Sequence, residues 1–226
     1  MAIKPEQEIN SMRLYSYYRS SAAYRVRIAL ELKGLDYEYF AVNLLLAQQK
    51  SGDYMAKNPQ GLVPALETTE GVLIPQSVAI MEWLEETCPE PPILPSEPLQ
   101  RALVRSVVNS IACDIHPLNN LSVTNYLQNP LGVSPEHVKT WYAKWVARGF
   151  DAIEQNIQDR GGLCCFGDTP TMADACLIPQ VYNALRFDVD MQGYQQILRV
   201  WEHCNTLPAF ARAHPDAQPD SPPLAP

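Results

Sequence analysis

The first part of the chain alternates between strand-like and helix-like hydrophobic patterns. Residues 13–16 and 37–42 are short runs with aromatic and aliphatic side chains, which predicts two strands. Between them, Val26, Ala29 and Leu30 lie on one face of a helix. This part of the sequence therefore predicts a β-α-β unit.

The following residues predict the second half of a small α/β domain. Residues 63–68 and 72–74 are two short strand candidates separated by a glycine turn, after a short helix near residues 50–57. Helical spacing returns over residues 76–87. The order βαβ followed by ββα predicts a thioredoxin-like fold, in which an antiparallel hairpin and a closing helix complete the sheet.

Beyond a cluster of five prolines, the strand pattern disappears and the apolar residues repeat at helical spacing. Two long helices are expected over residues 104–118 and 138–157. A third opens with a capping-box pattern that ends at Asp174, and its apolar residues on nearly every side predict a central buried helix. Shorter helices are expected over residues 194–204 and 208–213. The second part of the chain is therefore predicted to be all-α.

These patterns divide the chain into two domains and two extensions. The proline cluster holds the chain extended and marks the boundary. We expect a poorly ordered C-terminal extension, because its last residues are rich in proline. The predicted parts are a thioredoxin-like α/β domain over residues 12–88, an all-α domain over residues 99–214, and terminal extensions at residues 1–11 and 215–226.

Composition narrows the classes of function. The formal net charge is -8, from 17 basic and 25 acidic residues, and no dense basic run occurs, so neither nucleic acid nor an anionic membrane is expected as a partner. No signal-peptide pattern and no apolar run near the ~20 residues of a membrane span is present, which predicts a soluble cytoplasmic protein. Six cysteines show neither CxxC nor Cys/His ligand spacing, so we expect buried thiols and no metal.

Five short segments carry the most specific signal in the chain. They are Ser20-Ser21-Ala22-Ala23-Tyr24-Arg25-Val26-Arg27-Ile28-Ala29-Leu30 and residues 58–66, 76–80, 115–123 and 171–181. In this order they resemble the zeta class of glutathione transferases, which contains the maleylacetoacetate isomerases. The resemblance runs from residue 12 to residue 219. It implies the cytosolic glutathione transferase fold, glutathione as the cofactor and a homodimer.

The resemblance places the thiol of glutathione at the start of the first helix. A thiol of ordinary pKa is mostly protonated at neutral pH, so the site must favour the thiolate. Free N–H groups and the positive end of the helix dipole do this, with a hydroxyl donor. We expect Ser20 to be that donor, with Ser21 as its helper or alternate. Capping of the helix by both serines is the other interpretation.

The same resemblance implies a set of residues that bind the rest of glutathione. The Val63-Pro64 bond is expected to be cis and to turn the backbone of Val63 toward the cysteinyl part of the tripeptide. Gln76 and Ser77 begin a helix whose free N–H groups suit the γ-glutamyl carboxylate. Ordinary capping by Ser77 stays open, and Gln60 is a weaker candidate for a contact.

Arg19 and Arg186 are the candidates for binding an acidic substrate. A guanidinium group suits a carboxylate, and Arg186 lies at a position that resembles the substrate-carboxylate arginine of the zeta class. Asn119 and Asn120 are further candidates for substrate contacts. The implied reaction converts a maleyl compound to its fumaryl isomer: the thiolate adds to the double bond, the resulting single bond rotates, and elimination returns glutathione.

The sequence leaves three alternatives for function. Maleylacetoacetate is the expected substrate, because residues 121–123 look more like the maleylacetoacetate enzymes than like maleylpyruvate isomerase, which carries basic residues there. Dehalogenation of small α-halo acids needs the same thiolate and carboxylate-binding groups. Ala22 stands where the zeta class has cysteine, and this departure motivates the third alternative, a non-catalytic glutathione-fold binding module.

Overall fold

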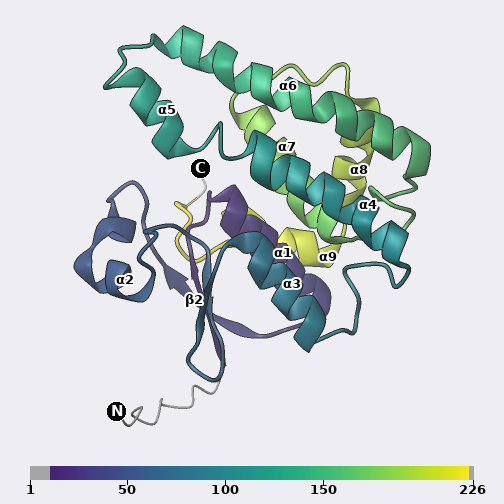
Figure 1. The fold of residues 1–226 in the computed structure, drawn as a ribbon, viewed down its shortest axis with the longest axis horizontal. Coiled ribbons are helices and arrows are strands. Elements are labelled where there is room, and N and C mark those ends of the chain that lie inside the picture. Colours follow the sequence, from purple (N-terminus) through teal and green to yellow (C-terminus); the bar gives the residue numbers. More distant parts are fainter. Residues whose placement is uncertain (1–10, 224–226) are drawn as a thin grey trace. The chain divides into compact units, whose positions relative to one another are not determined.

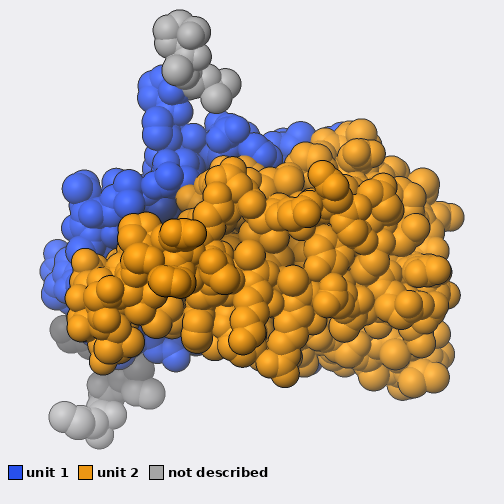
Figure 2. All heavy atoms as spheres, turned by 90° about the horizontal axis from the view of Figure 1, so that it is seen from above, with its two compact units in different colours: residues 1–92, 208–226 blue, residues 93–207 orange. Residues whose placement is uncertain are grey.

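The computed structural model describes residues 11–223 and divides the chain into two compact units (Figures 1 and 2). Unit 1 comprises residues 1–92 and 208–226, and unit 2 comprises residues 93–207. Residues 208–213, which we expected in the helical domain, thus belong to unit 1. Of the expected terminal extensions, residues 1–10 and 224–226 lie outside the described residues.

Unit 1 is built on a four-stranded mixed sheet with the strand order β2-β1-β3-β4. Strands β1 and β2 are parallel, whereas β3 is antiparallel to both β1 and β4. This topology confirms the predicted βαβ and ββα halves. The strands are β1 (Met12–Ser16), β2 (Tyr37–Ala41), β3 (Ala65–Glu67) and β4 (Leu73–Pro75).

The sheet buries side chains on both of its faces. Successive residues of a strand point to opposite faces, and in β1 both Leu14 and Tyr15 are buried. Tyr15 packs with Ala65 of β3 and with Tyr54 of α2. Helix α1 packs against α3 and α9. The helical segments of unit 1 are α1 (Ser21–Lys33), η1 (Gln48–Lys50), α2 (Gly52–Lys57), α3 (Ser77–Thr87), α9 (Pro208–Ala213) and η3 (Pro215–Ala217).

The C-terminal segment is tied into unit 1 by two buried or half-buried polar groups. The guanidinium of Arg27 is fully buried and donates to the carbonyl of Ala213 at 3.0 Å. Asp220 accepts from the hydroxyl of Tyr39 at 2.6 Å and from the backbone N–H of Tyr18 at 3.1 Å. Poor order was therefore the wrong expectation for residues 215–223.

Unit 2 consists of helices, as predicted, although the expected helix over residues 104–118 is divided. Its first part is α4, and a π-helical segment, η2, follows. Helix α7 is buried nearly all round and packs against α4, η2 and α8. Gly149 lets α6 approach η2, since a Cβ atom there would lie 2.2 Å from Cδ1 of Ile115. The elements are α4 (Pro98–Asn109), η2 (Ser110–Ile115), α5 (Leu121–Gln128), α6 (Pro135–Arg160), α7 (Met172–Arg186) and α8 (Gln195–Asn205).

Membrane crossing is a separate question from the fold. Within residues 11–223, no helix combines the length and the apolar character that a bilayer crossing requires.

Candidate functional site

The start of α1 presents a hydroxyl group beside free backbone N–H groups. Ser20 is the N-cap, and its Oγ accepts from the backbone N–H of Ala23 at 3.2 Å. A hydroxyl can accept one hydrogen bond and still donate its proton to another group. The first turn contains no acidic residue that would repel a bound anion or take its place. Capping and donation to a thiolate are therefore compatible roles for Ser20.

The neighbours of Ser20 differ in how accessible they are. Ser21 is buried, whereas Ser20 and Ala22 are half-buried. Arg19 lies with its guanidinium 5.2 Å from the ring centroid of Tyr18 and donates to the hydroxyl of Tyr17 at 3.4 Å. The accessibility of Ser20 favours it over Ser21 as the donor to a ligand.

The backbone before β3 has the expected geometry. The Val63-Pro64 peptide bond is cis, which confirms what the resemblance implied. Glu90-Pro91 is a second cis bond that the sequence analysis did not predict. Val63 is half-buried and packs against the cluster around Tyr15. The side chain of Val63 thus serves the core, and only its backbone is a candidate for ligand contact.

Two predicted glutathione residues meet at the start of α3. Gln76 donates from its amide to Oε1 of Gln60 at 2.9 Å. Gln76 is also the N-cap of α3, with φ at 73° and without a side-chain capping bond in the structure of residues 11–223. A non-glycine residue with positive φ is strained, and such strain gathers at functional sites. The first N–H groups of α3 are therefore available to an external anion.

Ser77 does not cap α3, contrary to the interpretation that the sequence left open. It is the first residue of the helix, is buried, and accepts from Nη1 of Arg25 at 3.4 Å. Arg25 comes from α1, so this hydrogen bond joins the first turns of α1 and α3. It therefore links the starts of α1 and α3, which are the two predicted anion-binding helix ends of unit 1.

The predicted substrate arginine lies at the C-terminal end of α7. Arg186 is exposed, donates to Oδ1 of Asn183 at 3.4 Å, and lies 4.6 Å from the ring centroid of Phe187. Phe187 in turn stacks on Tyr142 at 4.2 Å between centroids. Burial raises the pKa of Tyr142 to about 12, while the positive charge of Arg186 opposes that shift. The end of a helix also favours a cation.

The paired asparagines have local structural partners. Nδ2 of Asn119 donates to the backbone carbonyl of Tyr142 at 3.1 Å. Oδ1 of Asn120 caps α5 by accepting from the backbone N–H and the hydroxyl of Ser122 at 2.9 and 2.8 Å. Asn119 therefore lies beside the same tyrosine as Arg186, whereas Asn120 is engaged as an ordinary N-cap. Their contacts with substrate stay a prediction.

Sequence reasoning missed Gln180, a polar residue on the buried helix α7. Its side chain is 1% exposed and lies beside Tyr142, on which it acts to lower the pKa. Its amide makes no hydrogen bond of ordinary geometry with the described residues apart from this interaction with Tyr142. Buried polar groups are costly unless they are paired, so Gln180 and Tyr142 form one buried polar pair. A glutamine among the apolar residues Ile178, Pro179 and Val181 was the available signal.

A cavity of about 360 Å³ opens elsewhere in unit 2, between η2 and α6. None of the predicted site residues lines it. Its lining residues are Ser110, Cys113, Asp114, Ile115, Leu118, Trp145, Arg148, Gly149 and Ala152.

Comparison with known proteins places this arrangement in a family. Residues 14–92 match the family model described as "Glutathione S-transferase, N-terminal domain". The chain is 50% identical to the maleylacetoacetate isomerase of Pseudomonas aeruginosa over 213 residues, which cover 93% of this chain and 99% of that protein.

Solved structures agree with the sequence relatives. A holo structure of maleylpyruvate isomerase, described as a bacterial zeta-class glutathione S-transferase, has a TM-score of 0.90 at 44% identity and covers 93% of this chain and 100% of its own. Maleylacetoacetate isomerase from Anaeromyxobacter dehalogenans, with glutathione in its active site, has a TM-score of 0.86 at 44% identity, covering 94% and 98%. The chain therefore belongs to the zeta-class glutathione transferase and maleylacetoacetate isomerase family.

Proposed function

We propose that this protein is a glutathione-dependent isomerase that converts maleylacetoacetate to its fumaryl isomer. The observation that carries the proposal is the similarity, over nearly the whole of both chains, to a maleylacetoacetate isomerase. The start of α1 supports it, because Ser20 offers a half-buried hydroxyl at the positive end of a helix.

The residues of unit 1 fit glutathione at three points. The hydroxyl of Ser20 is placed to donate to a sulfur anion, and the cis bond at Val63-Pro64 presents backbone groups before β3. The start of α3, where Gln76 makes no capping bond, suits a carboxylate. When bound, glutathione supplies a thiolate that adds reversibly to the substrate double bond, so that rotation and elimination yield the trans isomer.

The protein's own groups manage charge in this reaction. Ser20 and the first N–H groups of α1 lower the pKa of the bound thiol by stabilising its anion. Arg186 at the end of α7 and Arg19 before α1 are each candidates for holding a substrate carboxylate. A guanidinium in that role also favours the negative charge that the substrate carbonyl takes up during addition.

Maleylpyruvate is the second candidate substrate. The structural similarity to a maleylpyruvate isomerase favours it. Residues 121–123 of this chain are Leu, Ser and Val, however, and Ser122 is engaged with Asn120 in the cap of α5. The chain thus has no cation there for a second carboxylate, and we favour maleylacetoacetate.

An ultraviolet assay of maleylacetone isomerisation with and without glutathione tests the proposal. We expect glutathione-dependent turnover that falls about 100-fold in Ser20→Ala, as when a single anion-stabilising donor is removed. Ser51→Ala is the matched control, because Ser51 caps α2 in the same way, by accepting from the backbone N–H of Tyr54. Absence of glutathione-dependent turnover in the wild type, or equal loss in both variants, would contradict the proposal.

We also propose a homodimer, which light scattering on the purified chain can test. The cytoplasmic location stays a prediction.

A further inference from the structure

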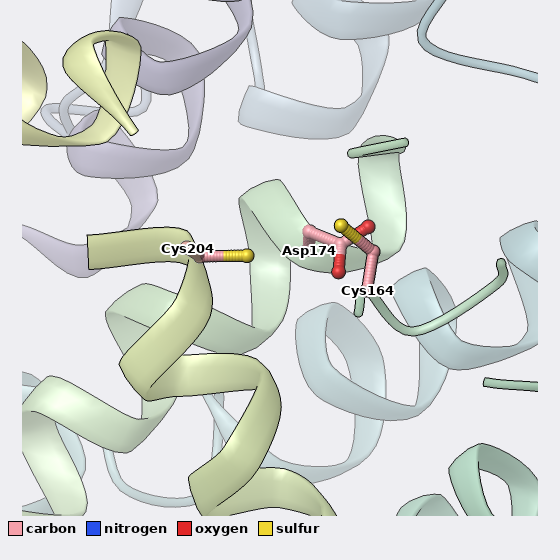
Figure 3. A group of neighbouring side chains, drawn as sticks. All are labelled: Cys164, Asp174 and Cys204. Carbon is pink, nitrogen blue, oxygen red and sulfur yellow. The ribbon is translucent and has the colours of Figure 1, made fainter. Parts of the chain in front are cut away.

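Three buried side chains from distant parts of the sequence converge inside unit 2 (Figure 3). Cys164 lies in the loop between α6 and α7, Asp174 in the first turn of α7, and Cys204 in the last turn of α8. The three side chains point toward one another. The two Sγ atoms and a carboxylate oxygen all lie within 4.8 Å of one another, and all three residues are fully buried.

The carboxylate of Asp174 is held in place by backbone and hydroxyl donors. Oδ1 accepts from the backbone N–H of Cys165 at 2.8 Å. Oδ2 accepts from the backbone N–H and the hydroxyl of Thr171 at 2.7 and 3.0 Å. The side chain of Cys165 also bonds to this carboxylate. A carboxylate has about four lone-pair sites, and a bound cation takes the place of this thiol proton. Such supporting hydrogen bonds are what orient the ligands of metal sites.

The two thiols are also held by ordered backbone. Cys164 donates its N–H to the carbonyl of Gly167 at 2.9 Å and accepts from the N–H of Gly162 at 3.2 Å. Gly167 has φ at 67°, a conformation that suits glycine and closes this loop tightly. Cys204 is fixed by its place in α8. The three donor atoms therefore come from rigid elements.

We propose that Cys164, Cys204 and Asp174 bind one thiophilic divalent cation of the Zn²⁺ type. Thiolate and carboxylate groups are established ligands for zinc, and the softness of two sulfurs disfavours Mg²⁺ and Ca²⁺. Tetrahedral bonds of ordinary zinc length place two sulfur ligands about 3.8 Å apart. The observed spacing needs a closure of about 1 Å or less to reach it. The set supplies three of the four ligands of a tetrahedral site.

The sequence alone could not reveal this cluster. Residues 164, 174 and 204 have none of the close spacings that identify zinc-binding motifs. Only the meeting of one loop and two helix ends brings their side chains together. The site is independent of the proposed isomerase reaction, because none of its residues contributes to the glutathione or carboxylate sites described above.

Loading with Cd²⁺ as the probe tests the site. Since the cluster is buried, the full chain is unfolded in guanidinium with a reductant, refolded with Cd²⁺ alone, and freed of excess metal by gel filtration. We expect one Cd²⁺ per chain by elemental analysis, with a thiolate-to-Cd²⁺ absorption band in the ultraviolet. Cys204→Ala should hold less than about one tenth of that amount. Cys176→Ala, which removes an equally buried thiol outside the cluster, should hold the wild-type amount.

Circular dichroism verifies that each protein has refolded, so that the metal content is counted per folded chain. Less than one tenth of a Cd²⁺ per folded wild-type chain, or equal loss in Cys176→Ala and Cys204→Ala, would overturn the proposal.

Discussion

Helices α3 and α7 begin in opposite ways. At the start of α7, Thr171 and Asp174 form a complete capping box in which both side chains bond to the backbone of the first turn. At the start of α3, Gln76 makes no capping bond within the described part of the chain and holds a φ of 73°. The first N–H groups of any helix lack partners within the helix. Helix α7 satisfies them internally, whereas α3 leaves them for another group.

This difference separates a cap that satisfies its own helix from one that leaves the helix N–H groups for a ligand. Asp174 is fully buried, and burial raises its pKa while its hydrogen bonds act in the opposite direction. Its carboxylate occupies the start of α7, where an external anion would otherwise bind. The start of α3 brings no carboxylate of its own, because its first turn contains no acidic residue. The same local pattern, a polar residue before an apolar helix, thus has two outcomes that depend on whether the cap is complete.

The largest effect is expected where the complete cap is removed. Asp174→Ala takes the acceptor from the N–H of Cys165 and from both donors of Thr171, and a buried donor without a partner costs about 1–3 kcal/mol. We expect the free energy of unfolding to fall by about 3 kcal/mol or more, measured with urea. Glu97→Ala is the control, since Glu97 caps α4 at an exposed position. It should cost about 1 kcal/mol, and equal losses would remove the distinction.

A smaller effect of opposite sign is expected at the incomplete cap. Gln76→Gly relieves the strain of positive φ, which costs a non-glycine residue about 1–3 kcal/mol. Part of this gain in stability is lost, because glycine has more conformational entropy in the unfolded chain. We expect stability to rise by up to about 1 kcal/mol while affinity for glutathione falls about tenfold. The stability is read from urea unfolding and the affinity from calorimetry.

Gln60→Ala is the matched control for that variant. It removes the same hydrogen bond between the two glutamine side chains but leaves the backbone of Gln76 unchanged. It should therefore show no gain in stability. If Gln76→Gly is less stable than Gln60→Ala, the strained backbone is not a site where stability has been given up for binding.

Periodicity predicted the fold well where burial follows a regular spacing. Strand β2, whose first four residues alternate between partly buried and exposed, and helix α7, which is buried on nearly every side, are such cases. Helix α5 was not predicted. All its residues are at least partly exposed, so its apolar positions do not follow a buried face. The assignment of α9 to unit 1 depends on packing against α1, a contact between distant segments that spacing cannot show.

The candidate site was predictable only as far as local sequence and resemblance reach. Ser20 was identified because an N-cap and its helix are adjacent in the chain. The hydrogen bond between Gln60 and Gln76 joins two loops, and the buried amide of Gln180 lies beside Tyr142 only because of how α6 and α7 pack. These features arise from tertiary structure. The spacing of residues in the sequence therefore cannot predict them.

The start of η3 offers a third kind of cap, one whose state depends on pH. His214 accepts from the backbone N–H of Asp216 at 3.2 Å through Nδ1, which only an unprotonated ring nitrogen can do. Burial lowers the pKa of His214, and the positive charge of Arg27 acts in the same direction, against the opposing effect of Asp216. The unfolded chain therefore binds a proton at His214 more readily than the folded chain does.

The sign of the pH dependence follows from this lowered pKa. Stability from His214 is fully present above its ordinary pKa of 6.5 and is lost as pH falls through the lower pKa of the folded state. His214→Asn keeps a side-chain acceptor that does not titrate, so we expect urea midpoints to fall less between pH 7.5 and pH 5 than in the wild type. This effect should be the smallest of the three, because His214 is only half-buried. Because all other titrating groups are common to both proteins, parallel pH profiles would show that this cap does not respond to pH.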